Sequence, residues 1–75
     1  MSETIVDARG HRCPIPTLRL ARALERAAPG ARLRLLADDP LARIDVPHFA
    51  AGKGCRIISC EQDGSVLAFV VQKGS

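Results

Sequence analysis

The pattern of apolar, polar and turn-forming residues predicts four strands in this chain. Residues 4–8, TIVDA, form a short β-branched run that precedes a glycine, as strands often do. In residues 31–37, ARLRLLA, leucines alternate with arginines, so this strand should bury one of its faces. Residues 55–62 and 65–73 flank an Asp-Gly turn, which indicates an antiparallel hairpin.

Helix-forming residues fill the segment from Pro14 to about Ala28, which is therefore predicted to be the first helix. The Pro-Gly pair at 29–30 should end it. One side of this helix is apolar and should pack on a sheet: Leu20, Leu24, Ala27 and Ala28, with Leu18 and Ala21 beside them. Another side forms a ridge of three arginines: Arg19, Arg22 and Arg26.

The second helical segment contains a proline that complicates its assignment. Pro47 would break a helix that ran from Pro40 through Gly52, because it removes a backbone donor and clashes one turn back. We therefore predict two helical starts in succession, a brief turn and then a separate helix. Asp39 caps a brief turn led by Pro40, and Asp45 caps a second helix whose first turn tolerates Pro47.

The element order β-α-β-α-β-β predicts an α+β fold with two layers. Neither helix has enough apolar circumference to be buried on all sides, so both should cover one face of a single sheet. The crossover through the first helix makes the first two strands parallel if they pair, whereas the final hairpin is antiparallel. We expect a two-layer α/β sandwich with a mixed four-stranded sheet, in a single domain over residues 1–75.

Cysteine count and hydropathy favour a reducing, aqueous compartment. The three cysteines are an odd number and cannot all pair within one chain, so a secreted disulfide framework is not expected. No run of eighteen apolar residues is present to span a membrane, and the acidic N-terminal stretch is not typical of a signal peptide. We expect a cytoplasmic protein with reduced thiols and no membrane partner.

Positive charge is concentrated in the first half of the chain. Residues 1–34 contain seven arginines and three acidic residues, whereas residues 35–75 contain four basic and five acidic residues. Such a basic half suits nucleic acid, an acidic protein surface or a small anion. Nucleic acid is the weakest of these, because two Phe and no Tyr or Trp leave little to stack on bases. The ridge of Arg19, Arg22 and Arg26 has an ordinary interpretation as a solvated helix face, and it is also the obvious docking surface for an acidic partner.

Cys13 stands between the first strand and the first helix, directly before two prolines. We place Pro14 at the first helical position and Pro16 at the third, where a missing N–H costs no helical hydrogen bond. Pro14 also favours an extended backbone at Cys13, which is the conformation of an N-cap residue. The two prolines therefore predict a sharp strand-to-helix corner with Cys13 at its tip.

This position favours the thiolate form of Cys13. The positive end of a helix dipole stabilises an anion, and Arg9, His11 and Arg12 add positive potential if they point inward. Such a thiolate could attack sulfane sulfur, carry it as a persulfide and surrender it to a second thiolate. The alternative is a small, buried and unreactive thiol.

The other cysteines and histidines form no recognisable metal site. Cys55 and Cys60 are five residues apart on a predicted strand, so their side chains should point to opposite faces and cannot bind one metal together. We interpret them as one core thiol and one partly exposed thiol, with a resolving role toward Cys13 as the alternative. His11 is interpreted as a solvated loop residue rather than a base. No metal or other cofactor is expected.

Two adjacent aspartates follow the second predicted strand. Asp38 and Asp39 would lie near the Cys13 corner if the end of this strand and the corner shared one edge of the sheet. The sequence Asp-Asp-Pro explains Asp39 as a capping residue without any further role. The role of Asp38 stays open.

The residues around Cys13 resemble those of the TusA/SirA-like sulfur-carrier family. The Cys-Pro-x-Pro hallmark of that family is matched by Cys13, Pro14, Ile15 and Pro16. The resemblance covers essentially the full length through further residues in compatible order: Asp7, Gly10, Arg12, Gly30, Asp38, Asp39, Pro40, Asp45, Pro47 and Phe49. It implies the β-α-β-α-β-β sandwich and a Cys13 that accepts sulfur as a persulfide.

The resemblance also implies two kinds of partner. A cysteine desulfurase or a rhodanese-like protein would donate the sulfur, and a sulfur-relay protein would accept it, toward tRNA thiolation, sulfur oxidation or cofactor synthesis. Whether such a carrier is called an enzyme is partly a matter of words, because it takes part in sulfurtransferase chemistry without a pocket for a small substrate. Two alternatives belong to other classes: an arginine-rich nucleic-acid-binding or regulatory module, and a haem sensor that uses Cys-Pro. The small core and the few aromatic residues argue against a haem pocket.

Overall fold

The computed structural model describes residues 3–12 and 14–74, which form six elements in the predicted order. Their bounds are β1 Thr4–Asp7, α1 Ile15–Arg26, β2 Arg32–Ala37, α2 Ala42–Gly52, β3 Arg56–Asp63 and β4 Val66–Gln72. Cys13, the central residue of the sequence prediction, lies outside the described residues.

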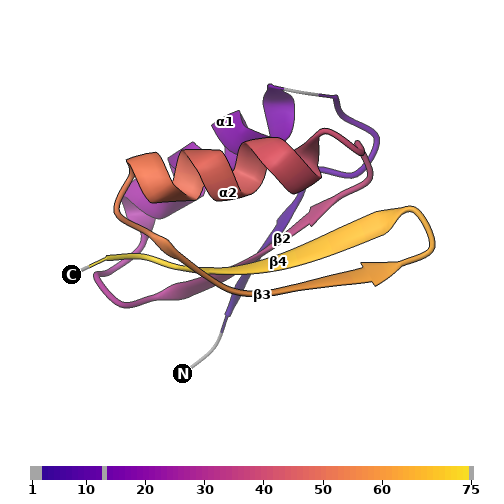
Figure 1. The fold of residues 1–75 in the computed structure, drawn as a ribbon. Helices are drawn as coiled ribbons and strands as arrows, with labels where there is room; N and C mark the ends of the chain where they lie inside the picture. Colours follow the sequence, from indigo (N-terminus) through magenta and orange to yellow (C-terminus); the bar gives the residue numbers. More distant parts are fainter. Residues whose placement is uncertain (1–2, 13, 75) are drawn as a thin grey trace.

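The four strands form one mixed sheet in the order β1-β2-β4-β3. β1 runs parallel to β2, and β4 runs antiparallel to both β2 and β3. Both helices cover the same face of this sheet, while β1 and β3 form its two edges (Figure 1). The fold is therefore an α+β two-layer sandwich, and the predicted fold class is confirmed.

The core lies between the sheet and the two helices. Leu33, Leu35 and Ala37 of β2 point inward, as their alternation predicts, and each is at most 1% exposed. They share the core with residues of α1, α2 and β4: Leu20, Leu24, Val46, Ala50, Phe69 and Val71. Burial of one large aliphatic side chain contributes about 1.5–3 kcal/mol. Among the described residues, no helix is both long and apolar enough to cross a membrane.

α2 is one continuous helix, so the prediction of two starts in series is wrong. The turn that Asp39 begins leads directly into the helix, because the N–H of Ala42 donates to the Asp39 carbonyl at 2.9 Å. Pro47 lies inside α2. The carbonyl that its missing N–H leaves without a helical partner belongs to Arg43, a residue on the exposed side of α2. Asp45 lies in the first turn of α2 and does not cap a separate helix.

The residues that follow β4 tie the end of α1 to the sheet. The Lys73 N–H donates to the Ala31 carbonyl at 2.8 Å. Its Nζ donates to the carbonyls of Leu24 and Ala27, at 2.7 and 2.8 Å. These carbonyls lie at the C-terminal end of α1, where a positive charge also complements the helix dipole. Lys73 therefore acts as a C-terminal cap from a distant part of the chain.

Candidate functional site

The chain leaves β1 through a tight loop that leads to the position of Cys13. Ala8 is fully buried, and its N–H donates to the Leu36 carbonyl at 2.8 Å, so the loop begins anchored on β2. The His11 N–H turns back to the Ala8 carbonyl at 3.3 Å. Gly10 has a φ of +82°, a conformation that other residues adopt at a cost. The loop thus turns sharply just before Cys13.

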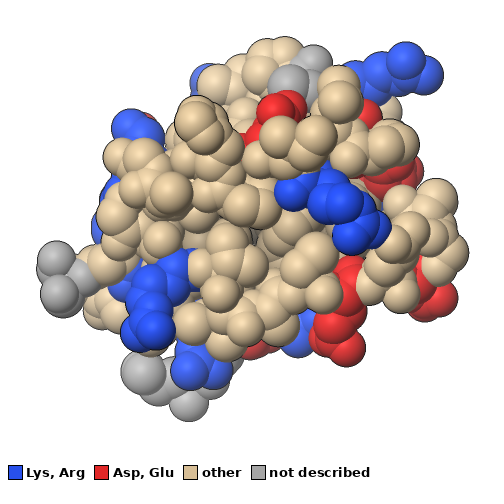
Figure 2. All heavy atoms as spheres, in the orientation of Figure 1, with Lys and Arg blue, Asp and Glu red and all other residues tan. Residues whose placement is uncertain are grey.

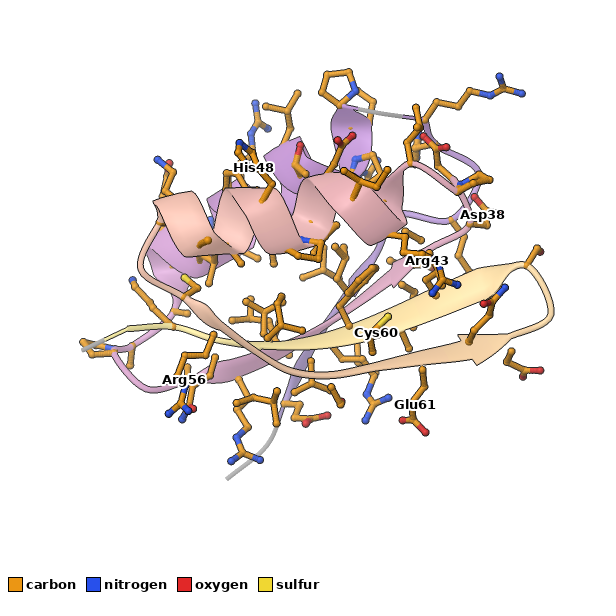
Figure 3. The ribbon with its side chains drawn as sticks, in the orientation of Figure 1. Asp38, Arg43, His48, Arg56, Cys60 and Glu61 are labelled. Atoms are coloured by element: carbon orange, nitrogen blue, oxygen red, sulfur yellow. The ribbon has the colours of Figure 1, made fainter. Side chains whose placement is uncertain are left out.

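Asp38, directly after β2, holds this loop in place. The Gly10 N–H donates to both carboxylate oxygens of Asp38, at 2.9 Å to Oδ1 and 3.1 Å to Oδ2. Figure 3 shows Asp38 beside the loop that joins β1 to α1. A hydrogen bond to an ionised acceptor is stronger than one between neutral groups. The predicted proximity of the two segments is therefore confirmed up to Gly10, and Asp38 gains a structural role.

Asp39 takes the turn-forming role that the sequence predicts. The Leu41 N–H donates to Asp39 Oδ1 at 3.1 Å. The two aspartates also face the loop after β1 across a shallow depression of about 500 Å³. Its lining comes from two short stretches of chain, 10–12 and 38–40.

α1 begins one residue later than predicted. Its first residue is Ile15 and its N-cap is Pro14, so Pro16 occupies the second helical position and the N-cap assignment of Cys13 is wrong. Pro14 has φ −97° and ψ 14°, which lie outside the helical region. The Ile15 N–H donates to the Arg12 carbonyl at 2.9 Å, and this bond makes a tight turn ahead of the helix. Both prolines still occupy positions that need no N–H.

His11 is held by α1 rather than solvated. It is half-buried, and its Nε2 lies 3.2 Å from Nη2 of Arg19. A guanidinium can only donate, so Nε2 accepts this hydrogen bond and its lone pair is occupied. This contact disfavours His11 as a base for Cys13, as the sequence interpretation holds, but it also ties His11 to α1, which that interpretation did not predict.

Arg9 forms an ion pair with Asp7 of β1. Its Nη2 lies 2.8 Å from Oδ2 of Asp7, and its Nε lies 2.9 Å from Oδ1. These hydrogen bonds lower the pKa of Asp7 to about 2, and they raise the pKa of Arg9. The charge of Arg9 is therefore largely balanced by Asp7.

The family model of the sulfurtransferase TusA matches residues 4–73 of this chain. The chain belongs to the TusA family. A crystal structure of a SirA-like protein from Desulfitobacterium hafniense has the same fold, with a TM-score of 0.82 and 29% sequence identity. The match covers 96% of this chain and 99% of that one. The predicted family is therefore confirmed, and membership of it supports a general role as a sulfur carrier.

A sulfur carrier of the TusA family needs a reactive group that other proteins can reach. Arg12 and Pro14, which flank Cys13 in the chain, are both exposed. Within residues 3–12 and 14–74, Arg12 forms no ion pair. The proposed thiolate of Cys13 itself stays a prediction, because that residue lies outside the described part of the chain.

The three arginines of the predicted ridge lie on one exposed side of α1. Arg19, Arg22 and Arg26 line a groove between α1 and β1, together with Ile15 and Leu18 of the first turn. Their exposure agrees with the sequence interpretation, and their use in docking stays a prediction.

A β-bulge changes the expected placement of the two other cysteines. The pairing of β3 with β4 shifts its register between Ile57 and Ser59, so one extra residue interrupts the alternation. Cys60 therefore lies opposite the core residue Phe69, while Cys55 also packs against the core. The prediction that these side chains point to opposite faces is wrong. Cys55 is half-buried and Cys60 is exposed on the helix-covered side of β3 (Figure 3). Among the described residues, no three His, Cys, Asp or Glu come together as metal ligands.

Two features of this site were absent from the sequence prediction. The bond between Gly10 and Asp38 joins residues 28 apart, so no local pattern could reveal it. The contact of Asp7 with Arg9 is local, and a signal for it exists. An aspartate whose side chain accepts the N–H two residues later forms an Asx turn, and Arg9 donates its N–H to Asp7 Oδ1 at 3.1 Å.

Proposed function

We propose that this protein carries sulfane sulfur as a persulfide on Cys13. Membership of the TusA family supports the general role. The observation that carries the specific proposal is the firmly held loop before Cys13, in which Asp38 binds the Gly10 N–H with both oxygens. Arg12 and Pro14 remain exposed beside it. A carrier needs this combination, because its reactive residue must be positioned and yet accessible to two different proteins.

The electrostatics of the corner support an anionic Cys13. The first turn of α1, residues 15–18, contains no acidic residue of its own, although Asp39 and Asp45 line a small depression together with Pro16 and Thr17. A thiolate is the nucleophilic form of cysteine, and positive potential lowers the pKa of a thiol. Arg12 adds to this potential, whereas Arg9 is balanced by Asp7.

The transfer is an exchange between sulfur atoms. The Cys13 thiolate attacks the outer sulfur of a persulfide on the donor protein. A new S–S bond forms at Cys13, the S–S bond of the donor breaks, and the donor cysteine leaves as a thiolate. The acceptor thiolate then repeats the step on the Cys13 persulfide. No external oxidant or reductant is consumed in either transfer.

A cysteine desulfurase or a rhodanese-like protein is the proposed donor, and a sulfur-relay protein is the proposed acceptor. The acceptor would lead toward tRNA thiolation, sulfur oxidation or cofactor synthesis. The exposed side of α1 with Arg19, Arg22 and Arg26 suits contact with acidic partner surfaces. The proposal requires a compartment in which thiols stay reduced, such as the cytoplasm.

Sulfur loading tests this proposal. The protein is incubated with a cysteine desulfurase, the cofactor of that enzyme and cysteine, and its intact mass is then measured. We expect a gain of about 32 Da, one sulfur atom, that a reducing agent removes. The Cys13→Ser variant should show no gain. A wild-type protein that gains no mass, or a variant that still does, would contradict the proposal.

A further inference from the structure

The free edge of β1 and the arginine side of α1 form a single groove of about 770 Å³. β1 lines it over its whole length, and α1 lines it from Ile15 to Arg26, with Ala27 directly after the helix. Because α1 returns antiparallel to β1, Ile15 lies toward the Asp7 end of the groove and Arg26 toward the Thr4 end. The Ile15 end adjoins the corner that leads to Cys13. One end of the groove is thus formed by a residue that lies two positions after the proposed sulfur-carrying residue in the chain.

The backbone of β1 offers unpaired hydrogen-bonding groups to this groove. β1 pairs with β2 on one side only, since it is an edge of the sheet. The Ala8 N–H points to β2, where it meets the Leu36 carbonyl. Backbone groups alternate in direction along a strand, so those of Ile5 and Asp7 point away from β2. These two residues can therefore pair with an added strand.

Exposed apolar side chains line the same groove. On α1, Leu18 is 53% exposed and Ile15 is 37% exposed. Large apolar residues that gather on one exposed surface commonly mark an interaction site. A partner that covered them would gain from their burial.

The charge of the groove selects the partner. Within residues 3–12 and 14–74, Arg22 and Arg26 form no ion pair, and the hydrogen bond of Arg19 is to His11. The one acidic side chain that lines the groove, Asp7, is bonded to Arg9. The groove therefore presents uncompensated guanidinium groups, which pair best with carboxylates.

We propose that an extended acidic segment of a partner protein binds this groove as an additional strand on β1. Its backbone pairs with Ile5 and Asp7, its carboxylates meet Arg22 and Arg26, and an apolar side chain covers Ile15 and Leu18. This mode of recognition takes affinity from main-chain hydrogen bonds and specificity from the side chains. The inference rests on the proposed function only in that it brings the partner beside Cys13. A nucleic acid fits less well, because neither phenylalanine lines the groove.

A designed peptide tests the inference directly. The probe is a short blocked peptide of alternating valine and glutamate, titrated into isotopically labelled full-length protein and followed by NMR. We expect chemical-shift changes at Ile5, Asp7 and the exposed side of α1, together with slower amide exchange at Ile5 and Asp7. A matched peptide with lysine in place of glutamate should leave the spectrum unchanged. The inference is overturned if the two peptides bind alike or if the shifts map to β3.

Variants separate the backbone contribution from the charge contribution. Ile5→Pro removes an outward N–H at an edge position that tolerates proline, whereas Ile5→Val retains it. We expect the proline variant to bind the peptide about tenfold more weakly and the valine variant to match the wild type. The double variant Arg22→Glu, Arg26→Glu should also lose about tenfold or more, whereas Arg56→Glu on β3 should not.

Two results for these variants would count against the inference. One is unchanged peptide affinity in the double variant Arg22→Glu, Arg26→Glu. This result contradicts the inference even if Ile5→Pro fails to fold. The other is competition by an oligouridylate that binds the same arginines more tightly than the peptide does.

The inference and the proposed function can fail separately. Inorganic polysulfide can load Cys13 by giving up its outer sulfur and leaving a shorter polysulfide, and this reaction needs no docked peptide. Absence of sulfur on Cys13 after that treatment would contradict the proposed function alone. Absence of peptide binding in a protein that loads normally would contradict the inference alone.

Discussion

The two edges of the sheet differ in ways that suggest different uses. β3 is eight residues long and carries a bulge between Ile57 and Ser59. β1 is four residues long and pairs with β2 in an uninterrupted register. Bulges and charged residues discourage an edge strand from pairing with another chain. β3 has both, since Glu61 and Asp63 are exposed at its end.

The helix beside each edge strengthens the contrast. On the β3 side, Arg43 of α2 donates a hydrogen bond to the side chain of Gln62, so its charge is used within the molecule. Figure 2 shows that the Lys and Arg residues of this face are dispersed among uncharged residues. On the β1 side, Arg19, Arg22 and Arg26 stand on successive turns of α1. In the proposed binding mode the partner pairs with β1, whereas β3 carries the bulge and a compensated arginine beside it.

The largest expected effect is on the free energy of unfolding. It distinguishes the side of α1 that packs on the core from the side that lines the groove. Leu20 is 0% exposed, whereas Leu18 is 53% exposed. Leu20→Ala should lower the free energy of unfolding by about 2–5 kcal/mol, because it leaves a cavity between α1 and the sheet. Leu18→Ala should change it by less than about 0.5 kcal/mol. Urea denaturation of both variants measures this, and equal losses would show that α1 has no separate free side.

A smaller loss of stability is expected at the C-terminal end of α1. Lys73→Met removes the hydrogen bonds from Nζ to the Leu24 and Ala27 carbonyls while it keeps an unbranched apolar stem. We expect the free energy of unfolding to fall by about 1–3 kcal/mol, since these bonds involve a charged donor. The exposed Lys53, whose Nζ lies 6.0 Å from the centre of the Phe49 ring, offers a matched control, and Lys53→Met should lower the stability by less than about 1 kcal/mol. Similar stabilities of the two variants would argue against the capping role.

The next prediction concerns the loop that precedes Cys13. Asp38→Asn keeps the shape of the side chain but removes the charge that accepts the Gly10 N–H. We expect a loss of about 1 kcal/mol in stability, faster amide exchange at Gly10 and slower sulfur loading of Cys13. Glu61→Gln on the β3 edge is the control. If amide exchange at Gly10 is unchanged in Asp38→Asn, Asp38 does not hold this loop in place.

The smallest expected effect is the loss of folding stability at acidic pH that comes from Asp7 on β1. The hydrogen bonds from Arg9 hold the pKa of Asp7 at about 2, below the ordinary value of 3.8. A carboxyl whose pKa is lowered by folding stabilises the folded state fully above its unfolded pKa, and that contribution is lost as the pH falls through about 2. Asp7 and Arg9 are both exposed, so the gain in stability is small. An NMR titration of the Asp7 carboxyl that gave an ordinary pKa would contradict this contact.

Much of the fold could be predicted from the sequence because its signals are local. The alternation in β2 identified the inward residues Leu33, Leu35 and Ala37, and all three lie in the core. The Asp-Gly turn located the hairpin of β3 and β4. The errors came from features without a local signature. Pro47 was read as a break, yet α2 continues through it without interruption. The bulge in β3 depends on pairing with β4, so the sides of Cys55 and Cys60 could not be predicted.

The candidate site was predicted in part for a similar reason. The Cys-Pro-x-Pro motif is contiguous, so it pointed to Cys13 and to the family without any structure. Asp38 and Lys73 act on residues far away in the chain, and their roles appear only once the fold brings those segments together. The groove between β1 and α1 likewise combines two elements, of which the sequence revealed only the arginines.

The most direct test of the account is to locate the carried sulfur among the three thiols. Trypsin should release Cys13, Cys55 and Cys60 in three different peptides, spanning residues 13–19, 54–56 and 57–73. The wild-type protein is loaded by a desulfurase that is supplied with ³⁴S-labelled cysteine, and each peptide is then analysed by mass spectrometry. We predict that the heavy sulfur is confined to the peptide of residues 13–19. Heavy sulfur found mainly on either of the other two peptides would contradict the account.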